Sequence, residues 1–291
     1  MDAGDASTVI LGEAKVEHCQ IGFIGAGNMA GSLIGGLIAD GYPSRQIHVA
    51  DIDTGKLKRL QQRFDVHIHT DNEAVVRACD LVVLAVKPQQ MRRLTREIAT
   101  AVRERRPLIV SIAAGIREAD LERWLGGEAA IVRAMPNTPA LVQSGATGLH
   151  ANAQVSARQR DQAESLLRAV GVTVWVDREE QLDAVTALSG SGPAYFFLLM
   201  EAMQKAGIEL GLPPTTARLL VEQTALGAAK LALEADADPG ELRRQVTSPG
   251  GTTERAIAVM AEAGFEEAIL RALRAAYRRS QELSKQLGED E

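Results

Sequence analysis

A glycine-rich turn between an apolar run and an apolar helical pattern is the feature that most restricts the possible folds. The run Cys19 to Ile24 stops at Gly25, and the segment Asn28 to Ala39 then carries apolar residues at helical spacing. The intervening sequence fits GxGxxA, in which Gly25 permits a tight turn and Gly27 lets the backbone approach a pyrophosphate. The small side chain of Ala30 allows the helix to pack closely on its strand. The sequence therefore predicts a strand, a turn and a helix that bind a dinucleotide.

Further apolar runs continue this pattern through the first part of the chain. The run Asp80 to Val86 is apolar at both alternate positions, which is typical of a strand buried on both faces of a parallel sheet. Strands that alternate with helices, such as Gly55 to Phe64, pair through right-handed crossovers. We therefore predict a Rossmann-like, doubly wound α/β domain over residues 18–177. The other predicted strands are Gln46 to Ala50, Leu108 to Ile112, Ala130 to Met135, Ala146 to Leu149 and Val172 to Val176.

The composition changes after Asp177. Ala, Leu, Glu, Gln and Arg dominate, no alternating strand pattern appears, and Gly or Pro residues divide the segment into helices. Residues 178–291 are therefore predicted to form an all-helical domain. Its apolar stripes, including Tyr195 to Met200, are wider than so small a domain can bury alone. This pattern favours a homodimer formed through the helical domain.

Charge and cysteine content exclude several other classes. The net charge of −6 and a pI near 5.5 indicate no nucleic-acid partner, because polyanion binding needs clustered Lys and Arg. No apolar run approaches the roughly 18 residues of a membrane span, so we expect a soluble cytoplasmic protein. Residues 1–17 lack the pattern of a secretory signal and are interpreted as a flexible extension. Cys19 and Cys79 are expected in the core, and His67 and His69 lack a third ligand nearby, so no metal site is predicted.

The acid expected to bind the cofactor ribose is Asp51, 20 residues after Gly31, and Asp53 is a second candidate. A carboxylate at this point accepts from the ribose hydroxyls and repels a 2′-phosphate, which favours NAD over NADP. An equally weighted alternative is that Asp51 caps the helix that begins near Thr54. The predicted preference for NAD over NADP therefore depends on Asp51.

Other candidate contacts follow the ends of later strands, where ligands bind in open α/β sheets. They belong to the segments Ala85 to Pro88, Ser111 to Gly115 and Met135 to Pro139, and Lys87 is either a nucleotide contact or a solvated charge. Each segment could also be ordinary loop chemistry. The full set of predicted cofactor-binding residues is Gly25, Ala26, Gly27, Asn28, Met29, Asp51, Asn72, Ala85, Val86, Lys87, Pro88, Ala113, Ala114, Gly115 and Asn137.

Six segments together resemble the pyrroline-5-carboxylate reductase family, from about Cys19 to Leu287. The resemblance implies reduction of 1-pyrroline-5-carboxylate to L-proline by NADPH or NADH, the last step of proline biosynthesis. It also implies a Rossmann domain, a helical dimerisation domain and, in several members, rings of dimers. The segments are IGFIGAGNMA (21–30), LAVKPQ (84–89), SIAAGI (111–116), VRAMPNTPA (132–140), TALSGSGPAY (186–195) and VTSPGGTT (246–253).

The segment SPGGTT precedes an amphipathic helix and would form a helix N-terminus with unpaired N–H groups. Such a site can hold the substrate carboxylate without an arginine. The predicted substrate-binding residues are Ser248, Gly250, Gly251, Thr252 and Thr253. Ser248 and Thr253 are the predicted catalytic residues: Ser248 adds a hydrogen bond, and Thr253 matches the family's hydroxyl beside the ring nitrogen. No dedicated general acid is assigned, and a plain glycine-rich cap with Thr as N-cap is the alternative.

Two features separate this chain from related reductases. The segment Ser189 to Pro193 is expected to break two helices, with Ser191 as an N-cap, and structural capping is favoured over substrate contact. Related β-hydroxyacid dehydrogenases carry a lysine after such a segment, whereas Pro193, Ala194 and Tyr195 follow here.

Many members of the pyrroline-5-carboxylate reductase family have Ser, Thr or Asn where Asp51 stands in this chain, so we expect NADH to be used at least comparably to NADPH. A reductase of a six-membered imine and a non-catalytic dinucleotide-binding regulator are the alternative functions.

Overall fold

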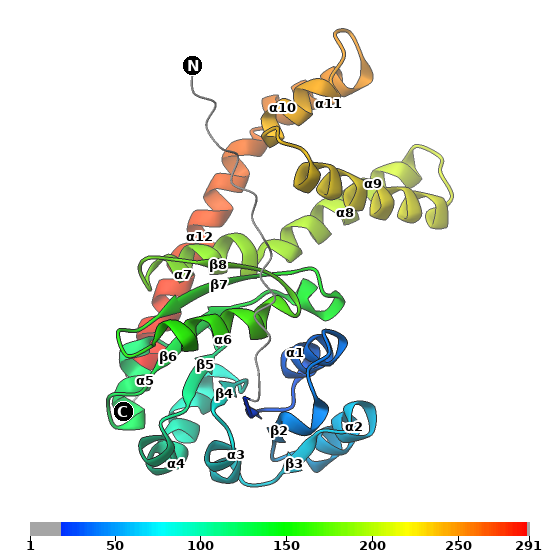
Figure 1. Cartoon of the computed structure of the whole chain (residues 1–291). Coiled ribbons are helices and arrows are strands. Elements are labelled where there is room, and N and C mark those ends of the chain that lie inside the picture. Colours follow the sequence, from blue (N-terminus) through cyan, green and yellow to red (C-terminus); the bar gives the residue numbers. More distant parts are fainter. Residues whose placement is uncertain (1–18, 290–291) are drawn as a thin grey trace, which may run out of the picture.

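The computed structural model describes residues 19–289, which form an α/β domain and a group of long helices that extends away from it (Figure 1). The predicted extension, residues 1–17, lies outside the described residues. The helical group begins with α7 (Gln181–Val185), just after the last strand of the sheet, β8 (Gly171–Trp175). The predicted combination of an α/β domain with a helical domain is confirmed.

An eight-stranded sheet forms the centre of the α/β domain. Its spatial order is β3-β2-β1-β4-β5-β6-β7-β8, so the chain changes direction across the sheet between β1 and β4. Ligands bind beyond the carboxyl ends of strands at such a switch point. In chain order the strands are β1 (Ile21–Ile24), β2 (Ile47–Ala50), β3 (His67–His69), β4 (Leu81–Leu84), β5 (Leu108–Ser111), β6 (Ile131–Met135), β7 (Gly145–Ala151) and β8.

One strand pair differs from the predicted all-crossover topology. β6 and β7 are antiparallel, whereas the other neighbouring strands are parallel. Only the short turn η2 (Thr138–Val142) joins β6 to β7. A parallel connection needs a dozen residues or more, usually with a helix, so the chain reverses direction here.

Helices cover both faces of the sheet. The apolar residues of α1, α2 and α6 pack on one face around Phe23, and those of α3, α4 and α5 pack on the other around Val82. β1, β4 and β5 are buried throughout, as expected for parallel strands covered on both sides. The covering elements are α1 (Asn28–Ala39), η1 (Ser44–Gln46), α2 (Thr54–Phe64), α3 (Asn72–Ala78), α4 (Pro88–Arg105), α5 (Glu118–Leu125) and α6 (Ala157–Arg168).

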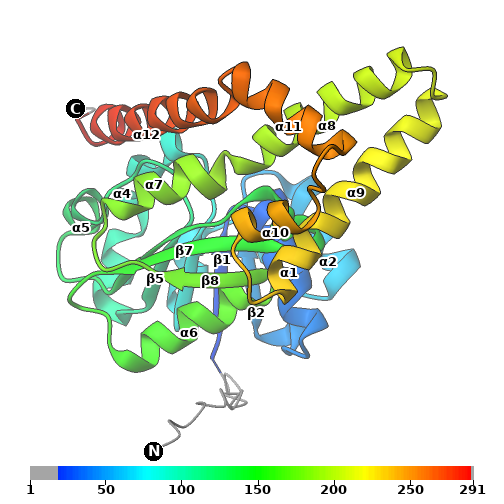
Figure 2. The same ribbon diagram turned by 90° about the horizontal axis from the view of Figure 1, so that it is seen from above.

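The remaining helices are longer and extend from the sheet. α8 and α9 pack against each other, and α12 returns so that its C-terminal end lies beside α5 (Figures 1 and 2). None of the described helices is both long enough and apolar enough to cross a bilayer. After α7 the elements are η3 (Thr186–Gly190), α8 (Gly192–Glu209), α9 (Pro214–Glu234), α10 (Pro239–Gln245), α11 (Thr252–Glu262) and α12 (Phe265–Glu289).

The predicted break between two helices at Ser189 to Pro193 is only a local change of helical geometry in the structure. η3 is a π-helical turn that joins α7 to α8, and Ser191 has helical backbone angles and no side-chain capping bond. Capping by Ser191 is therefore wrong, whereas Pro193 does lie in the first turn of α8. A Cβ on Gly190 would lie 2.7 Å from the Met135 side chain, so a glycine lets this turn approach the end of β6.

The helical group leaves large apolar side chains in water. On α8, Phe196 and Phe197 are 65% and 62% exposed, and on α9 Leu226 and Leu233 are 54% and 84% exposed. Contiguous apolar surface of this kind marks a protein interface. The single chain therefore presents surface that self-association can bury, as the sequence predicted.

Candidate active site

Close contacts that glycine permits shape the turn after β1. Gly25 has a φ of +107°, and a Cβ there would lie 2.5 Å from the Ala85 carbonyl oxygen. Its N–H donates to the Ala50 carbonyl at 2.8 Å, which ties the turn to the end of β2. α1 follows with Gly27 as its N-cap, and no side chain caps its first turn. The N-terminus of α1 therefore has N–H groups free to bind an anion such as a pyrophosphate.

The two carboxylates after β2 have different roles. Asp51 accepts from Ala26 N at 2.7 Å and from Asp53 N at 2.8 Å, so it fastens the glycine turn to the loop before α2. Asp53 caps α2 by accepting from the N–H groups of Gly55 and Lys56. The Lys56 N–H bond is the main cause of a lowered Asp53 pKa. The alternative that Asp51 caps this helix is therefore wrong.

A cavity of about 680 Å³ lies beside the glycine turn, between α1, α2 and η2. Lys56, Arg59 and Arg63 of α2 line it together with Gly27 and Asn28. These cations were not among the predicted site residues, because the sequence argument sought only an acid after the second strand. Their spacing placed them on one helix face and was the signal that could have found them.

The predicted residues after β4 and at the start of α1 lie together. Ala85 contacts the glycine turn from the end of β4, and Val86, Lys87 and Pro88 lead into α4. Lys87 is exposed at the N-cap position of α4, where its side chain makes no capping bond. Met29 packs partly against the core, so its side chain is only partly accessible to a ligand.

The loop after β5 lies under the C-terminal helix. Gly115 has a φ of +76°, and a Cβ there would lie 3.1 Å from Leu287 and 3.6 Å from the Ser284 nitrogen. Ala113 is buried and Ala114 is half-buried. α12 therefore packs against the loop that is predicted from the sequence to contact the cofactor.

The two predicted amide contacts already have protein partners. Asn137 donates to the Ser189 hydroxyl at 3.1 Å and accepts from Ala146 N at 2.9 Å, so it links the loop after β6 to η3 and β7. Asn72 donates to Glu97 of α4 at 2.9 Å. These hydrogen bonds orient both amides, and each amide keeps further donors or acceptors with which it could bind a cofactor.

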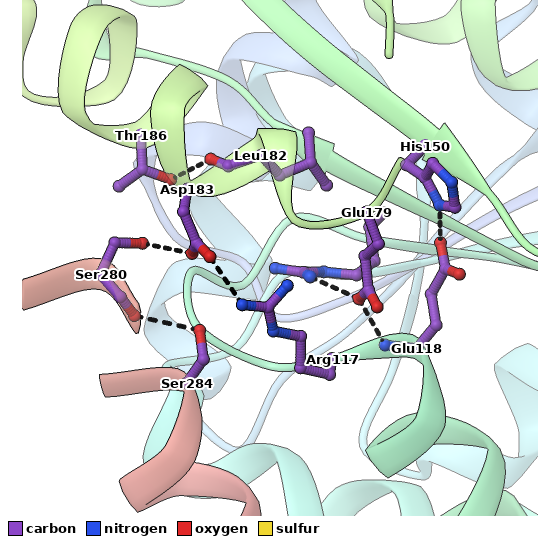
Figure 3. Close-up of polar contacts among 10 residues, drawn as sticks. Arg117, Glu118, His150, Glu179, Leu182, Asp183, Thr186, Ser280 and Ser284 are labelled. Carbon is purple, nitrogen blue, oxygen red and sulfur yellow. Dashed lines mark hydrogen bonds and ion pairs between the residues drawn. The ribbon is translucent and has the colours of Figure 1, made fainter. Parts of the chain in front are cut away.

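A buried polar network connects the α/β domain to the helical group (Figure 3). Asp183 of α7 accepts from Arg117 Nη2 at 2.6 Å and from the Ser280 hydroxyl of α12 at 2.7 Å. The Asp183 side chain is 3% exposed and that of Arg117 is 22% exposed. Because Arg117 follows the Gly115 loop directly, Asp183 joins this loop to α12 by bonding both Arg117 and Ser280.

A second part of the network lies beside the first. Glu179 accepts from the Glu118 backbone N–H at 2.7 Å and pairs with Arg133 of β6. His150 of β7 bonds Glu118 at 2.7 Å, and burial raises the pKa of Glu118 (Figure 3). These contacts hold the start of α5 against the segment that leads into the helical domain.

The SPGGTT loop forms a second uncapped helix start. Gly251 is the N-cap of α11 without a side-chain capping bond, so the alternative with Thr as N-cap is wrong. Gly250 has a φ of +71°, and its N–H donates to the Glu254 carboxylate at 2.7 Å. Ser248 is exposed and Thr253 is half-buried. The Gly251 N–H also bonds the Ser248 carbonyl oxygen, at 3.0 Å, so both glycine N–H groups have partners and the first turn of α11 supplies the remaining main-chain donors.

A single chain does not bring this loop to the glycine turn. α11 packs against α12, and Figure 1 shows it at the far end of the helical group, well away from α1. Two helix N-termini suited to anions thus lie in different parts of the molecule, one of them in a doubly wound sheet. The glycine turn at the switch point of the sheet is typical of dinucleotide binding, and with a separate helical group the chain fits the class of two-domain dinucleotide-dependent oxidoreductases.

Comparison with protein families agrees with this class and narrows it. Residues 179–283 match the family described as pyrroline-5-carboxylate reductase dimerisation, and residues 20–115 match NADP oxidoreductase coenzyme F420-dependent. The pyrroline-5-carboxylate reductase of Pseudomonas aeruginosa is 54% identical over 93% of this chain and 98% of that protein. That of Escherichia coli is 38% identical over 91% of this chain and 98% of that protein.

Solved structures give the same result. A pyrroline-5-carboxylate reductase from Coxiella burnetii is 48% identical, with a TM-score of 0.88 over 91% of this chain and 98% of that one. The Plasmodium falciparum structure with NADP bound is 27% identical, with a TM-score of 0.81 over 92% and 99% of the two chains. The chain belongs to the pyrroline-5-carboxylate reductase family. Membership confirms the resemblance and the predicted class of enzyme, an NAD(P)H-dependent reductase with a domain for self-association.

Proposed function

We propose that this protein reduces 1-pyrroline-5-carboxylate to L-proline with NADPH or NADH, as the last step of proline biosynthesis in the cytoplasm. The observation that carries the proposal is the uncapped start of α11, which offers main-chain donors to a small carboxylate inside a reductase of this family. Such donors hold an anion without a permanent positive charge.

The glycine turn fits a dinucleotide. A Cβ on Gly27 would meet nothing within 4 Å, so open space lies where a pyrophosphate would approach, and the N-terminus of α1 faces it without a cap. Asp51 keeps the turn in place through Ala26 N. The reduced nicotinamide, when bound, supplies a hydride to the imine carbon.

On the substrate side, the N–H groups of Thr252 and Thr253 in the uncapped first turn of α11 hold the carboxylate, because those of Gly250 and Gly251 already bond Glu254 and Ser248, and the Ser248 side chain adds a hydrogen bond. The Thr253 hydroxyl bonds the ring nitrogen. As the imine carbon accepts the hydride, the C=N double bond becomes a single bond and the nitrogen gains a proton from solvent. Protonation of the imine makes its carbon more electrophilic, and fixed positioning supplies much of the remaining acceleration.

The two half-sites meet across a homodimer in this proposal. The SPGGTT loop lies far from the glycine turn of its own chain, and the exposed faces of α8 and α9 need a partner. A partner docked on those faces brings the loop of one protomer to the nucleotide domain of the other. A ring of dimers, which the resemblance implies, would need a further contact surface.

The assay follows NADH and NADPH oxidation with pyrroline-5-carboxylate and with its six-membered homologue. Thr253→Ala is expected to lower kcat with little change in dinucleotide affinity. Thr247→Ala serves as the hydroxyl control, because the Thr247 hydroxyl donates to the Arg243 carbonyl oxygen at 2.6 Å and is not among the predicted substrate-binding residues. Unaltered turnover in Thr253→Ala removes this residue from the mechanism. Preference for the six-membered ring, or no oxidation with either imine, favours the alternative functions.

A mixing experiment tests the shared site. Gly27→Asp places a carboxylate where the pyrophosphate binds without a steric clash in the fold, and Thr253→Ala disables the other half-site. Co-refolding two inactive variants restores activity if each site uses both protomers, because one site of the mixed dimer is then intact. No recovery in proven mixed dimers contradicts the arrangement.

A further inference from the structure

Two cations of α2 face the glycine turn without a carboxylate partner. Lys56 is half-buried and Arg59 is exposed, and both line the 680 Å³ cavity that Gly27 and Asn28 also line. Neither side chain forms an ion pair with an acidic residue among residues 19–289. Cations without an ion-pair partner that share a cavity with an anion-binding helix start are available for a second anion.

The carboxylates nearest to these cations, Asp51 and Asp53, bond backbone N–H groups and form no ion pair with Lys56 or Arg59. Asp53 directs one oxygen at the N–H groups of Gly55 and Lys56, and Asp51 uses its two oxygens on Ala26 and Asp53. Both acids bond backbone N–H groups, and the charges of Lys56 and Arg59 act on Asp53 without a direct contact, as smaller contributions to its lowered pKa. Arg63, the third cation that lines the cavity, lies over the Phe64 ring at 4.7 Å from its centre, so Lys56 and Arg59 are the two that the proposal uses.

The helical spacing makes the two cations converge. Lys56 and Arg59 are three residues apart on α2, so their side chains leave the same face of the helix. Arginine can grip a phosphate through two parallel N–H donors, and lysine adds a point charge. The first turn of α2 follows β2, and this is where the adenosine ribose of a dinucleotide lies in a doubly wound sheet.

We propose that Lys56 and Arg59 bind the 2′-phosphate of NADPH and allow this enzyme to use NADPH despite Asp51. The ligand class is a phosphomonoester on the adenosine ribose, read by two cations from one side of the cavity. Asp51 weakens binding of that phosphate and strengthens binding of the ribose hydroxyls of NADH. The two cations strengthen binding of NADPH alone. The proposal rests on the dinucleotide site of the proposed function and not on its substrate loop.

Calorimetric binding of 2′,5′-ADP and 5′-AMP tests the subsite without turnover. The variants are Lys56→Gln, Arg59→Gln and the double variant, and NADPH and NADH are titrated alongside the fragments. Lys58→Gln is the matched control, because Lys58 has the same charge on the same helix but does not line the cavity. The double variant is expected to lose about tenfold to a hundredfold in affinity for 2′,5′-ADP and NADPH.

The same variant should bind 5′-AMP and NADH within about twofold of the wild type, and the selective loss should shrink at high salt. An equal loss for NADPH and NADH overturns the proposal and assigns the cations to the pyrophosphate. An unchanged affinity for every ligand also overturns the proposal, because Lys56 and Arg59 are then only part of a solvated helix face. A wild type that binds neither dinucleotide rejects the proposed function itself, which distinguishes the two failures.

Discussion

Replacing the buried Asp183 by Asn isolates the charge that joins the two parts of the chain. The substitution keeps the size of the side chain and one acceptor, but it removes the negative charge that Arg117 and Ser280 contact at 2.6 and 2.7 Å. Arg117 would then remain in the network as an unpaired cation. The variant therefore tests whether this network stabilises the junction.

The burial of the pair sets the size of the effect. Removing one partner of a fully buried ion pair costs about 3–5 kcal/mol, whereas exposed pairs contribute about 0–1 kcal/mol. Asp183 is 3% exposed but Arg117 is 22% exposed, so water can solvate the freed guanidinium in part. Asn can also still accept from Ser280. We expect a loss of about 2–3 kcal/mol, or roughly 4–12 °C in Tm for a chain of this length.

The assay is urea and thermal unfolding at one fixed protein concentration, because self-association shifts apparent stability. Glu282→Gln is the control. It removes the acid of the Arg279 pair on α12, which has an N–O distance of 2.9 Å but side chains that are 55% and 59% exposed. The control should leave Tm nearly unchanged. Equal effects of the two variants, or no effect of Asp183→Asn, would refute the claim that burial decides the contribution.

Three further outcomes follow from single residues. Asp51→Ser should raise the NADPH to NADH ratio of kcat/KM by about tenfold or more, because it removes a charge beside the ribose; a large NADPH advantage that stays unchanged refutes this argument. Ser111→Ala should stabilise the fold by up to about 1 kcal/mol in urea unfolding, since its buried hydroxyl has no hydrogen-bond partner within the described residues, and a loss of stability contradicts it. His48 bonds His69 and stacks on His67, and burial is the main cause that lowers its pKa from 6.5 to about 4. Its neutral form therefore stabilises the fold above pH 6.5, and this contribution is lost as the pH falls from about 6.5 to about 4; His48→Gln should flatten that part of the stability profile.

The first strand, turn and helix could be predicted closely because their pattern is local. The segment Asn28 to Ala39 has the same bounds in the sequence prediction and in the structure. Its helical period and the glycine turn lie within twenty residues and need no distant partner. The antiparallel pairing of β7 depends instead on the length of the connection from β6, and strand patterns alone carry no direction.

The site was predicted less completely, because several of its contacts join residues that are far apart in the sequence. Asp51 and Asp53 both precede a helix, and only the backbone geometry decides that Asp53 is the cap. The contact between Asp183 and Ser280 spans 97 residues of sequence, and that between Asp183 and Arg117 spans 66. No local spacing encodes such pairs. The cations of α2 follow an acid that already fits the ribose, so the local pattern did not connect them to the glycine turn.

The long final helix connects the buried network to the proposed site, which each protomer shares with its partner. α12 has 25 residues and so spans about 37 Å, with α11 packed against it and the Gly115 loop beneath Ser284 and Leu287. Hydride transfer requires the reacting atoms to be about 3–3.5 Å apart, and a 1 Å error can cost a hundredfold in rate. The backbone hydrogen bonds of a helix fix its length, so the bond from Ser280 to Asp183 and the contacts of Gly115 help to set the position of α12, and of α11 packed on it, relative to the cofactor loop. In a dimer that exchanges loops, this same helix links the loop that a protomer offers its partner to that protomer's own cofactor site.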